Sequence, residues 1–63
     1  MPIIVFEGPK LEKGQKAELI KSFTQIASGI TKIPQESFSV IIRENDPENV
    51  GVGGVLLADR RRG

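Results

Sequence analysis

The chain has 63 residues, nine of them basic and eight acidic, and a net charge of +1. It contains neither cysteine nor histidine, so disulfides are excluded and a metal site is not expected. The charge balance and the lack of a long apolar stretch or signal peptide predict no nucleic-acid partner, no membrane partner and a cytoplasmic protein. We expect one domain, residues 1–63, which is too small to be more than marginally stable alone. Assembly into a homo-oligomer is the remaining source of stability.

The first expected element is a strand, Ile3–Phe6, whose unbroken apolar run is typical of a strand buried on both faces. Pro2 stands before it, directly behind Met1. Methionine is normally trimmed before a small residue such as proline, and trimming would leave Pro2 with a free secondary amine. An ordinary N-terminal amine titrates at about 7.7–8.0, and burial or nearby positive charge lowers that value towards neutrality. Pro2 is therefore the candidate proton-transfer base, although it could instead merely begin an edge strand.

A turn is expected over Glu7–Lys10, followed by a helix from about Leu11 to Thr31. Apolar residues with helical spacing form one stripe on this helix: Leu19, Phe23, Ile26 and Ile30, widened by Ile20 and Ala27. The helix start is predicted to be poorly capped, because no serine, threonine, aspartate or asparagine stands near it. Gly29 and Pro34 suit its end.

A second strand is expected over Phe38–Glu44, with Ser39, Ile41 and Arg43 on one face. Two strands joined by a long helix predict a βαβ unit with parallel pairing and a right-handed crossover. The helix covers one face of such a sheet. Ile41 and its neighbours on the other face then need a partner, which only another subunit can supply.

After a loop at Asn45–Asn49, the segment Val50–Leu57 predicts a small hairpin. Its Gly51–Gly54 stretch is more typical of a turn with positive φ or a close subunit contact than of a phosphate site, because the chain is nearly over. The Arg60–Arg62 run could contact nucleic-acid phosphates. No aromatic residue accompanies it, which favours a solubilising or intersubunit tail. The fold class is therefore α+β: one βαβ unit with a parallel two-stranded sheet and a C-terminal hairpin.

Several short motifs together resemble the 4-oxalocrotonate tautomerase family: Met1–Ile4, Gln15 and Lys16 with Leu19 and Ile20, Ser37 with Val40–Ile42, and Gly51–Gly54. The resemblance covers nearly the whole chain. It implies a homohexamer, a trimer of dimers whose sheets join back to back, with a hairpin reaching a neighbouring subunit. It also implies that Pro2 is the general base or acid in keto–enol isomerisation of unsaturated 2-oxo acids, without a metal or organic cofactor.

The substrate-binding residues of the family carry over less completely. Its arginine before the helix falls near Lys10, its second-strand arginine aligns with Ser39, and its aromatic residue before the hairpin glycines aligns with Val50. Arg43 shares the strand face of Ser39, further along the strand. Lys32, in a segment similar to one in the macrophage migration inhibitory factor family, is the preferred cation for a substrate carboxylate.

A dianionic muconate would lose charge-assisted hydrogen bonds worth about 1.5–3 kcal/mol each in such a pocket. The sequence therefore predicts a tautomerase that acts on small 2-oxo (enol) acids and favours a monoacid or a largely apolar carbonyl compound. One alternative is a non-catalytic oligomeric scaffold or interaction protein of the same fold, which retained Met1 would favour. Another is nucleic-acid binding through Arg60–Arg62.

Overall fold

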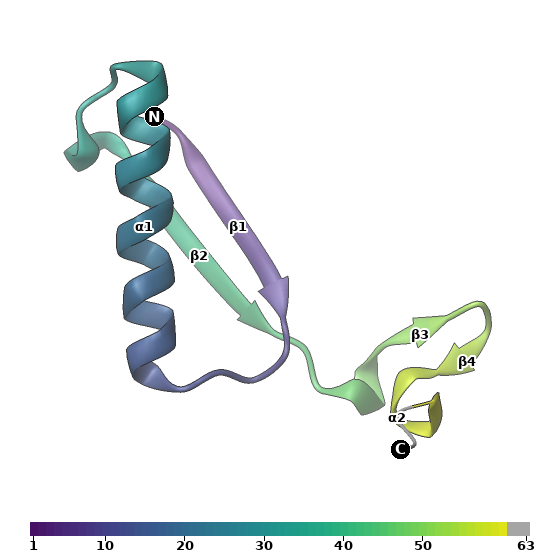
Figure 1. Ribbon diagram of the computed structural model, residues 1–63. Helices are drawn as coiled ribbons and strands as arrows, with labels where there is room; N and C mark the ends of the chain where they lie inside the picture. Colours follow the sequence, from purple (N-terminus) through teal and green to yellow (C-terminus); the bar gives the residue numbers. More distant parts are fainter. Residues whose placement is uncertain (61–63) are drawn as a thin grey trace.

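The computed structural model describes residues 1–60 of the chain. Its elements, in chain order, are β1 (Ile3–Gly8), α1 (Lys13–Thr31), the 3₁₀ turn η1 (Gln35–Ser37), β2 (Ser39–Glu44), the 3₁₀ turn η2 (Pro47–Asn49), β3 (Gly51–Val52), β4 (Val55–Leu56) and α2 (Leu57–Arg60). Figure 1 shows a βαβ body followed by an arm that carries β3, β4 and α2.

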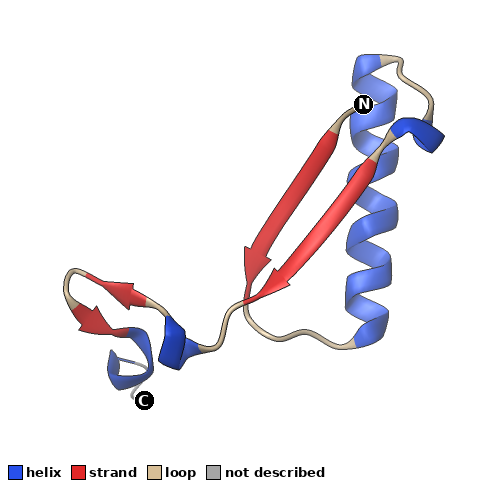
Figure 2. Cartoon of the chain, turned by 180° about the vertical axis from the view of Figure 1, so that it is seen from behind, coloured by secondary structure: helices blue, strands red, loops and turns tan. Residues whose placement is uncertain are grey.

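The body confirms the predicted βαβ unit. Strands β1 and β2 pair in parallel, in a register that runs from Ile3 opposite Ser39 to Gly8 opposite Glu44. Parallel neighbours need a long crossover connection, and α1 provides it. Figure 2 shows that α1 covers one face of this sheet and that no other element of the described chain covers the opposite face.

Both boundaries of the first turn differ from the prediction. Strand β1 continues through Glu7 and Gly8, because these residues still pair with the end of β2. Helix α1 begins at Lys13 and has Glu12 as its N-cap. The prediction of a poor cap missed the side chain of Gln15, whose Oε1 accepts the Glu12 N–H at 2.9 Å and satisfies one free donor of the helix end.

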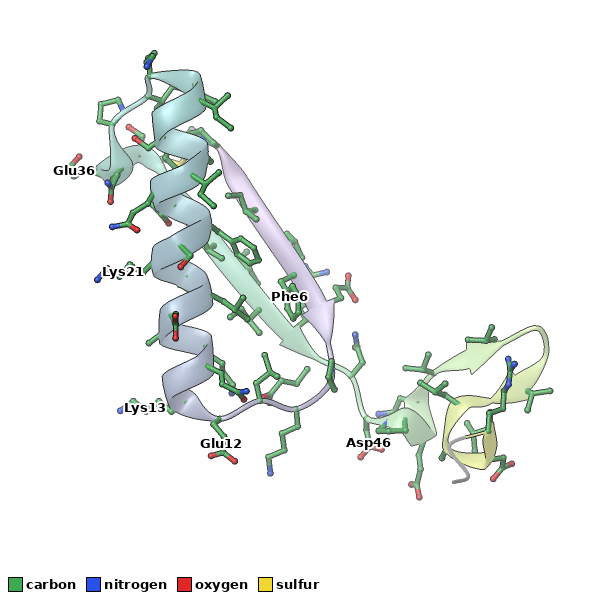
Figure 3. The ribbon with its side chains drawn as sticks, in the orientation of Figure 1. Phe6, Glu12, Lys13, Lys21, Glu36 and Asp46 are labelled. Carbon is green, nitrogen blue, oxygen red and sulfur yellow. The ribbon has the colours of Figure 1, made fainter. Side chains whose placement is uncertain are left out.

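The interior lies between the sheet and α1. Half-buried apolar side chains from all three elements meet there: Ile4 and Phe6 of β1, Val40 and Ile42 of β2, Leu19 and Phe23 of α1. The ring centroids of Phe6 and Phe23 are 6.1 Å apart, within the range for favourable aromatic pairs. Figure 3 shows the Phe6 ring between β1 and α1, with Lys21 projecting from the opposite side of the helix.

The other face of the sheet is open. Ile3, Val5 and Ile41 are 60%, 45% and 41% exposed, and no hydrophobic residue within 1–60 is fully buried. The prediction that Ile3–Phe6 is buried on both faces is therefore wrong for the single chain. Alternate residues of the strand face the helix and the open side, and only the first set is covered.

The C-terminal arm is the predicted hairpin. Strands β3 and β4 pair antiparallel, and Gly53 and Gly54 form the turn with φ of 62° and 82°. This is the positive φ for which glycine is suited. The arm extends away from the body (Figure 1). The radius of gyration is 15.1 Å, whereas a compact 63-residue domain has about 11 Å.

None of the helices described within residues 1–60 is long and apolar enough to cross a membrane.

Candidate functional site

Pro2 lies at the entry to β1. Its carbonyl accepts the Ser39 N–H at 3.0 Å, which extends the parallel pairing by one position. Strand alternation places Pro2 on the same side as Ile4 and Phe6, towards α1. Pro2 is half-buried, whereas Met1 is 91% exposed. The fold thus partly covers Pro2, while Met1 before it is open to solvent.

The topology brings two other candidates to the same end of the body. Helix α1 runs back against the direction of the strands, so its C-terminus lies level with their amino ends (Figure 1). Lys32 is the C-cap of α1, and Ser39 is the first residue of β2. Pro2, Lys32 and Ser39 therefore lie at one end of the βαβ unit.

Lys32 holds an unusual backbone conformation there. Its φ is 65° and its ψ is 19°, in the left-handed region, and its N–H bonds the Ser28 carbonyl at 2.9 Å. The side chain is exposed. An exposed lysine thus stands at the end of the body that carries Pro2.

The remaining candidates lie at the opposite end of the body. Arg43 is four residues beyond Ser39 on β2, about 13 Å along the strand, and its Nη1 is 3.3 Å from Oε2 of Glu7. Lys10 follows β1, in the loop before α1, and Val50 follows η2 at the start of the arm. Within one chain, none of these residues is brought to Pro2.

Glu44 makes two contacts that the sequence analysis did not single out. Its Oε2 accepts the Leu11 N–H at 3.0 Å and lies 2.6 Å from Nζ of Lys16. The hydrogen bond from Lys16, assisted by the one from Leu11, lowers the pKa of the Glu44 carboxyl. The carboxylate fastens the loop that carries Lys10 to the end of β2. The sequence does offer a signal for these contacts of Glu44: it is a carboxylate at the end of a predicted strand, and a loop that enters a helix lies beside it.

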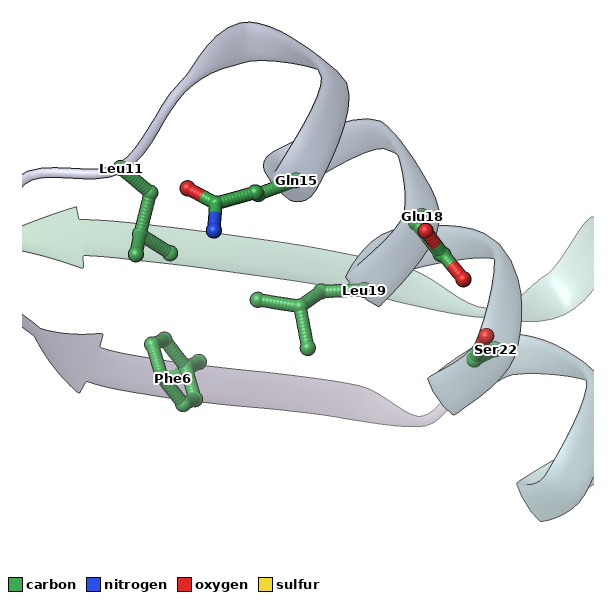
Figure 4. Close-up of a pocket in the computed structure, with 6 residues that line it drawn as sticks. All are labelled: Phe6, Leu11, Gln15, Glu18, Leu19 and Ser22. Carbon is green, nitrogen blue, oxygen red and sulfur yellow. The ribbon is translucent and has the colours of Figure 1, made fainter.

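A groove of about 370 Å³ lies between β1 and the first half of α1. It is mainly apolar and is lined by Phe6, Leu11, Gln15, Glu18, Leu19 and Ser22. Figure 4 shows Phe6, Leu11 and Leu19 turned towards one another across it. The groove is at the end of α1 away from Lys32, so it is separate from the site at Pro2. Within residues 1–60 no three potential metal-ligating side chains cluster.

The candidate Arg60–Arg62 run falls largely outside the described residues. Arg60 ends α2 and is exposed, and Arg61 and Arg62 lie beyond the described range.

Solved structures with the same fold come from tautomerase relatives. TomN, a 4-oxalocrotonate tautomerase homologue in the tomaymycin biosynthetic pathway, is 31% identical over 95% of this chain and 94% of its own, with a TM-score of 0.89. DmpI from Archaeoglobus fulgidus is 40% identical over 92% of this chain and 100% of its own, with a TM-score of 0.83. A heterohexamer 4-oxalocrotonate tautomerase from Chloroflexus aurantiacus is 26% identical over 97% of this chain and 98% of its own, with a TM-score of 0.80.

A search of curated proteins finds no match. The family model described as Tautomerase enzyme matches residues 2–60, which is nearly all of the chain and begins at Pro2. The parallel βαβ body, the glycine hairpin and these relatives lead to one conclusion: the chain belongs to the 4-oxalocrotonate tautomerase family.

Proposed function

We propose that the protein is a cofactor-independent tautomerase of small enol acids, in which the nitrogen of Pro2 is the general base and acid after removal of Met1. The observation that carries the proposal is the place of Pro2. It is half-buried at the entry to β1, its carbonyl is fixed by Ser39, and Lys32 lies at the same end of the body. Membership of a tautomerase family supports the same reaction type.

The reaction needs only a proton relay. The free amine of Pro2 accepts the proton of the enol hydroxyl, and the released O–H electron pair forms the carbonyl π bond. The electron pair of the C=C bond then takes a proton at carbon from the ammonium of Pro2. One proton leaves oxygen and one arrives at carbon, so Pro2 returns to its free-base form. A base with a pKa near the working pH suits both transfers.

The charges near Pro2 favour a substrate with one carboxylate. Among the cations of residues 1–60 considered for the site, Lys32 is the one at this end of the body, since Lys10 and Arg43 lie at the other end and Arg43 already faces Glu7. One ammonium can bind one carboxylate by a charge-assisted hydrogen bond. We therefore propose a monoacid such as phenylenolpyruvate as a better substrate than a dianionic muconate.

We also propose that the working form is a homohexamer. The open face of the sheet exposes Ile3, Val5 and Ile41, and the arm exposes Val52, Val55 and Leu56. Both surfaces need cover, and a relative in the same family is described as a heterohexamer. In such an assembly, Val50 of a neighbouring copy is available to complete an apolar wall of a Pro2 site.

The test is the ketonisation of phenylenolpyruvate by protein whose intact mass shows that Met1 is absent. Acetylation of the Pro2 nitrogen should lower kcat/KM by about 10²–10⁴-fold, because an acylated nitrogen is not a base and a positioned proton-transfer group contributes about that much. Pro2→Ala keeps a primary amine at the same place and should lower the rate by a smaller factor. The circular dichroism spectrum and oligomer size should stay unchanged in both, since the Pro2 hydrogen bond in the structure comes from its backbone carbonyl.

Two controls make the outcome specific. Pro9→Ala removes an exposed proline at the other end of the body and should leave the rate unchanged. Protein that retains Met1 also has an amide at Pro2 and should be as slow as the acetylated protein. An unchanged rate in either of these Pro2 forms rejects proline catalysis and leaves the scaffold alternative.

A further inference from the structure

The C-terminus of α1 has a feature that the fold alone does not require. Lys32 is the only non-glycine residue within 1–60 that has a positive φ. Helices commonly end in this conformation, but the residue that adopts it is usually glycine, because a side chain there meets the backbone. Lys32 keeps this less favourable conformation at a candidate binding site, so the groups around it must stabilise it.

Ser28 holds Lys32 from both sides. The Ser28 carbonyl accepts the Lys32 N–H at 2.9 Å, and Ser28 Oγ donates to the carbonyl of Ile33 at 2.6 Å. Ser28 is half-buried and Lys32 is exposed. The side chain of Ser28 thus joins the last turn of α1 to the residue that follows Lys32, and the lysine backbone is fixed between the two bonds.

A second side chain supports the same turn. Thr31 Oγ1 donates to the Ala27 carbonyl at 2.8 Å and accepts the Ile33 N–H at 3.3 Å. Both polar groups of the Ile33 backbone are therefore bonded by side chains of α1. Pro34 follows, and the residue before a proline avoids the helical region, which prevents α1 from continuing through Ile33.

We propose that Ser28 is a positioning residue, which fixes Lys32 in its left-handed conformation so that the ammonium stays at the Pro2 end and binds the substrate carboxylate. This inference rests on the proposed function. Ser28 itself does not touch the substrate. Its hydrogen bond limits the conformations that Lys32 samples before the substrate binds. Binding then costs less conformational entropy, which is preorganisation of a binding group.

The experiment compares Ser28→Ala with Ser28→Thr, on phenylenolpyruvate and on its methyl ester. Ser28→Ala removes the hydroxyl and should raise KM for the acid about three- to tenfold, the effect of one lost hydrogen bond. It should leave kcat, and KM for the ester, within about twofold. Ser28→Thr keeps a hydroxyl at the same position and should restore KM. The matched control is Ser22→Ala, another half-buried serine of α1, in the groove at the other end.

Binding without turnover separates this inference from the proposed function. Cinnamate resembles the substrate but cannot tautomerise, and cinnamamide is its uncharged counterpart. An NMR titration should show Ser28→Ala weakening cinnamate about three- to tenfold and leaving cinnamamide unchanged. If the wild type is inactive but Ser28→Ala weakens cinnamate binding in this way, the proposed reaction is rejected and the role of Ser28 in binding is kept. Equal weakening of both ligands, or no change for cinnamate, overturns the inference.

Discussion

At the residue scale, the proposed proton transfer depends on the state of a single peptide bond, between Met1 and Pro2. While Met1 is attached, Pro2 carries an amide nitrogen, which is not a base. Once Met1 is absent, the same nitrogen is a secondary amine at a half-buried position. Sequence reasoning could find Pro2 because the chain offers no histidine, cysteine or tyrosine as a competitor. It could not find Ser28, whose role depends on a hydrogen bond to Ile33.

Glu44 gives a prediction for the acid side of the stability curve. Lys16 and Leu11 lower its pKa in the folded chain. A lowered carboxyl pKa adds stability above the unfolded value of 4.5, and this contribution is lost as pH falls through the folded pKa. Glu44→Gln should therefore flatten the loss of stability below about pH 5, measured by urea denaturation across pH.

The control for Glu44 is Glu36→Gln, which replaces an exposed carboxylate in η1. It should leave the loss of stability below about pH 5 as it is in the wild type. If Glu44→Gln leaves the loss of stability below about pH 5 unchanged, the bonds to Lys16 and Leu11 contribute nothing to folding.

At the element scale, α1 connects the strands and also presents Lys32. The apolar spacing of its sequence predicts its length well, and Thr31 is its last residue as expected. Its start depends on the side chain of Gln15 reaching back to Glu12, a contact that the spacing of apolar residues does not record. Its end combines a conformation suited to glycine with a residue suited to binding an anion.

Replacing Lys32 by glycine should separate these two properties. Relief of left-handed strain, about 1–2 kcal/mol, offsets the added chain entropy of glycine and the loss of a cation at the helix end. We expect Lys32→Gly to keep its free energy of unfolding within about 0.5 kcal/mol of the wild type or to exceed it. KM for phenylenolpyruvate should rise by about tenfold or more, because the charged partner of the carboxylate is gone.

Lys21→Gly should lower the free energy of unfolding and leave KM unchanged. Lys21 projects away from the sheet in the middle of α1 (Figure 3), where glycine costs about 1 kcal/mol and no substrate lies near. A large loss of stability in Lys32→Gly, with KM unchanged, would assign Lys32 to the fold rather than to substrate binding.

At the scale of the whole molecule, the single chain leaves much of its apolar surface uncovered. It is extended, no hydrophobic residue within 1–60 is fully buried, and one face of its sheet exposes Ile3, Val5 and Ile41. Short chains without disulfides or metals need assembly to bury enough apolar surface. The open face is one surface that such an assembly can bury, because it exposes three apolar side chains on two paired strands.

A charge in the middle of this face should therefore break the assembly. We expect Ile41→Asp to dissociate the oligomer and to lose most of the folded signal, because an unpaired carboxylate would be buried at the interface. Sedimentation and circular dichroism at equal concentration give the two readouts. Gln25→Asp places the same charge on an exposed position of α1 and should change neither. An Ile41→Asp protein that keeps its size and fold would show that this face is not an interface.

The sequence alone determined the order of the elements, the parallel βαβ unit, the glycine hairpin and the family, because these follow from period, turn chemistry and motifs that are local along the chain. It also singled out Pro2. Only the tertiary structure decided the register, which sets Ser39 opposite Ile3, and the contacts of single side chains, such as the pair of Arg43 with Glu7. Such placement, like the bonds of Glu44 and Ser28, arises from contacts that side-chain type and spacing do not specify.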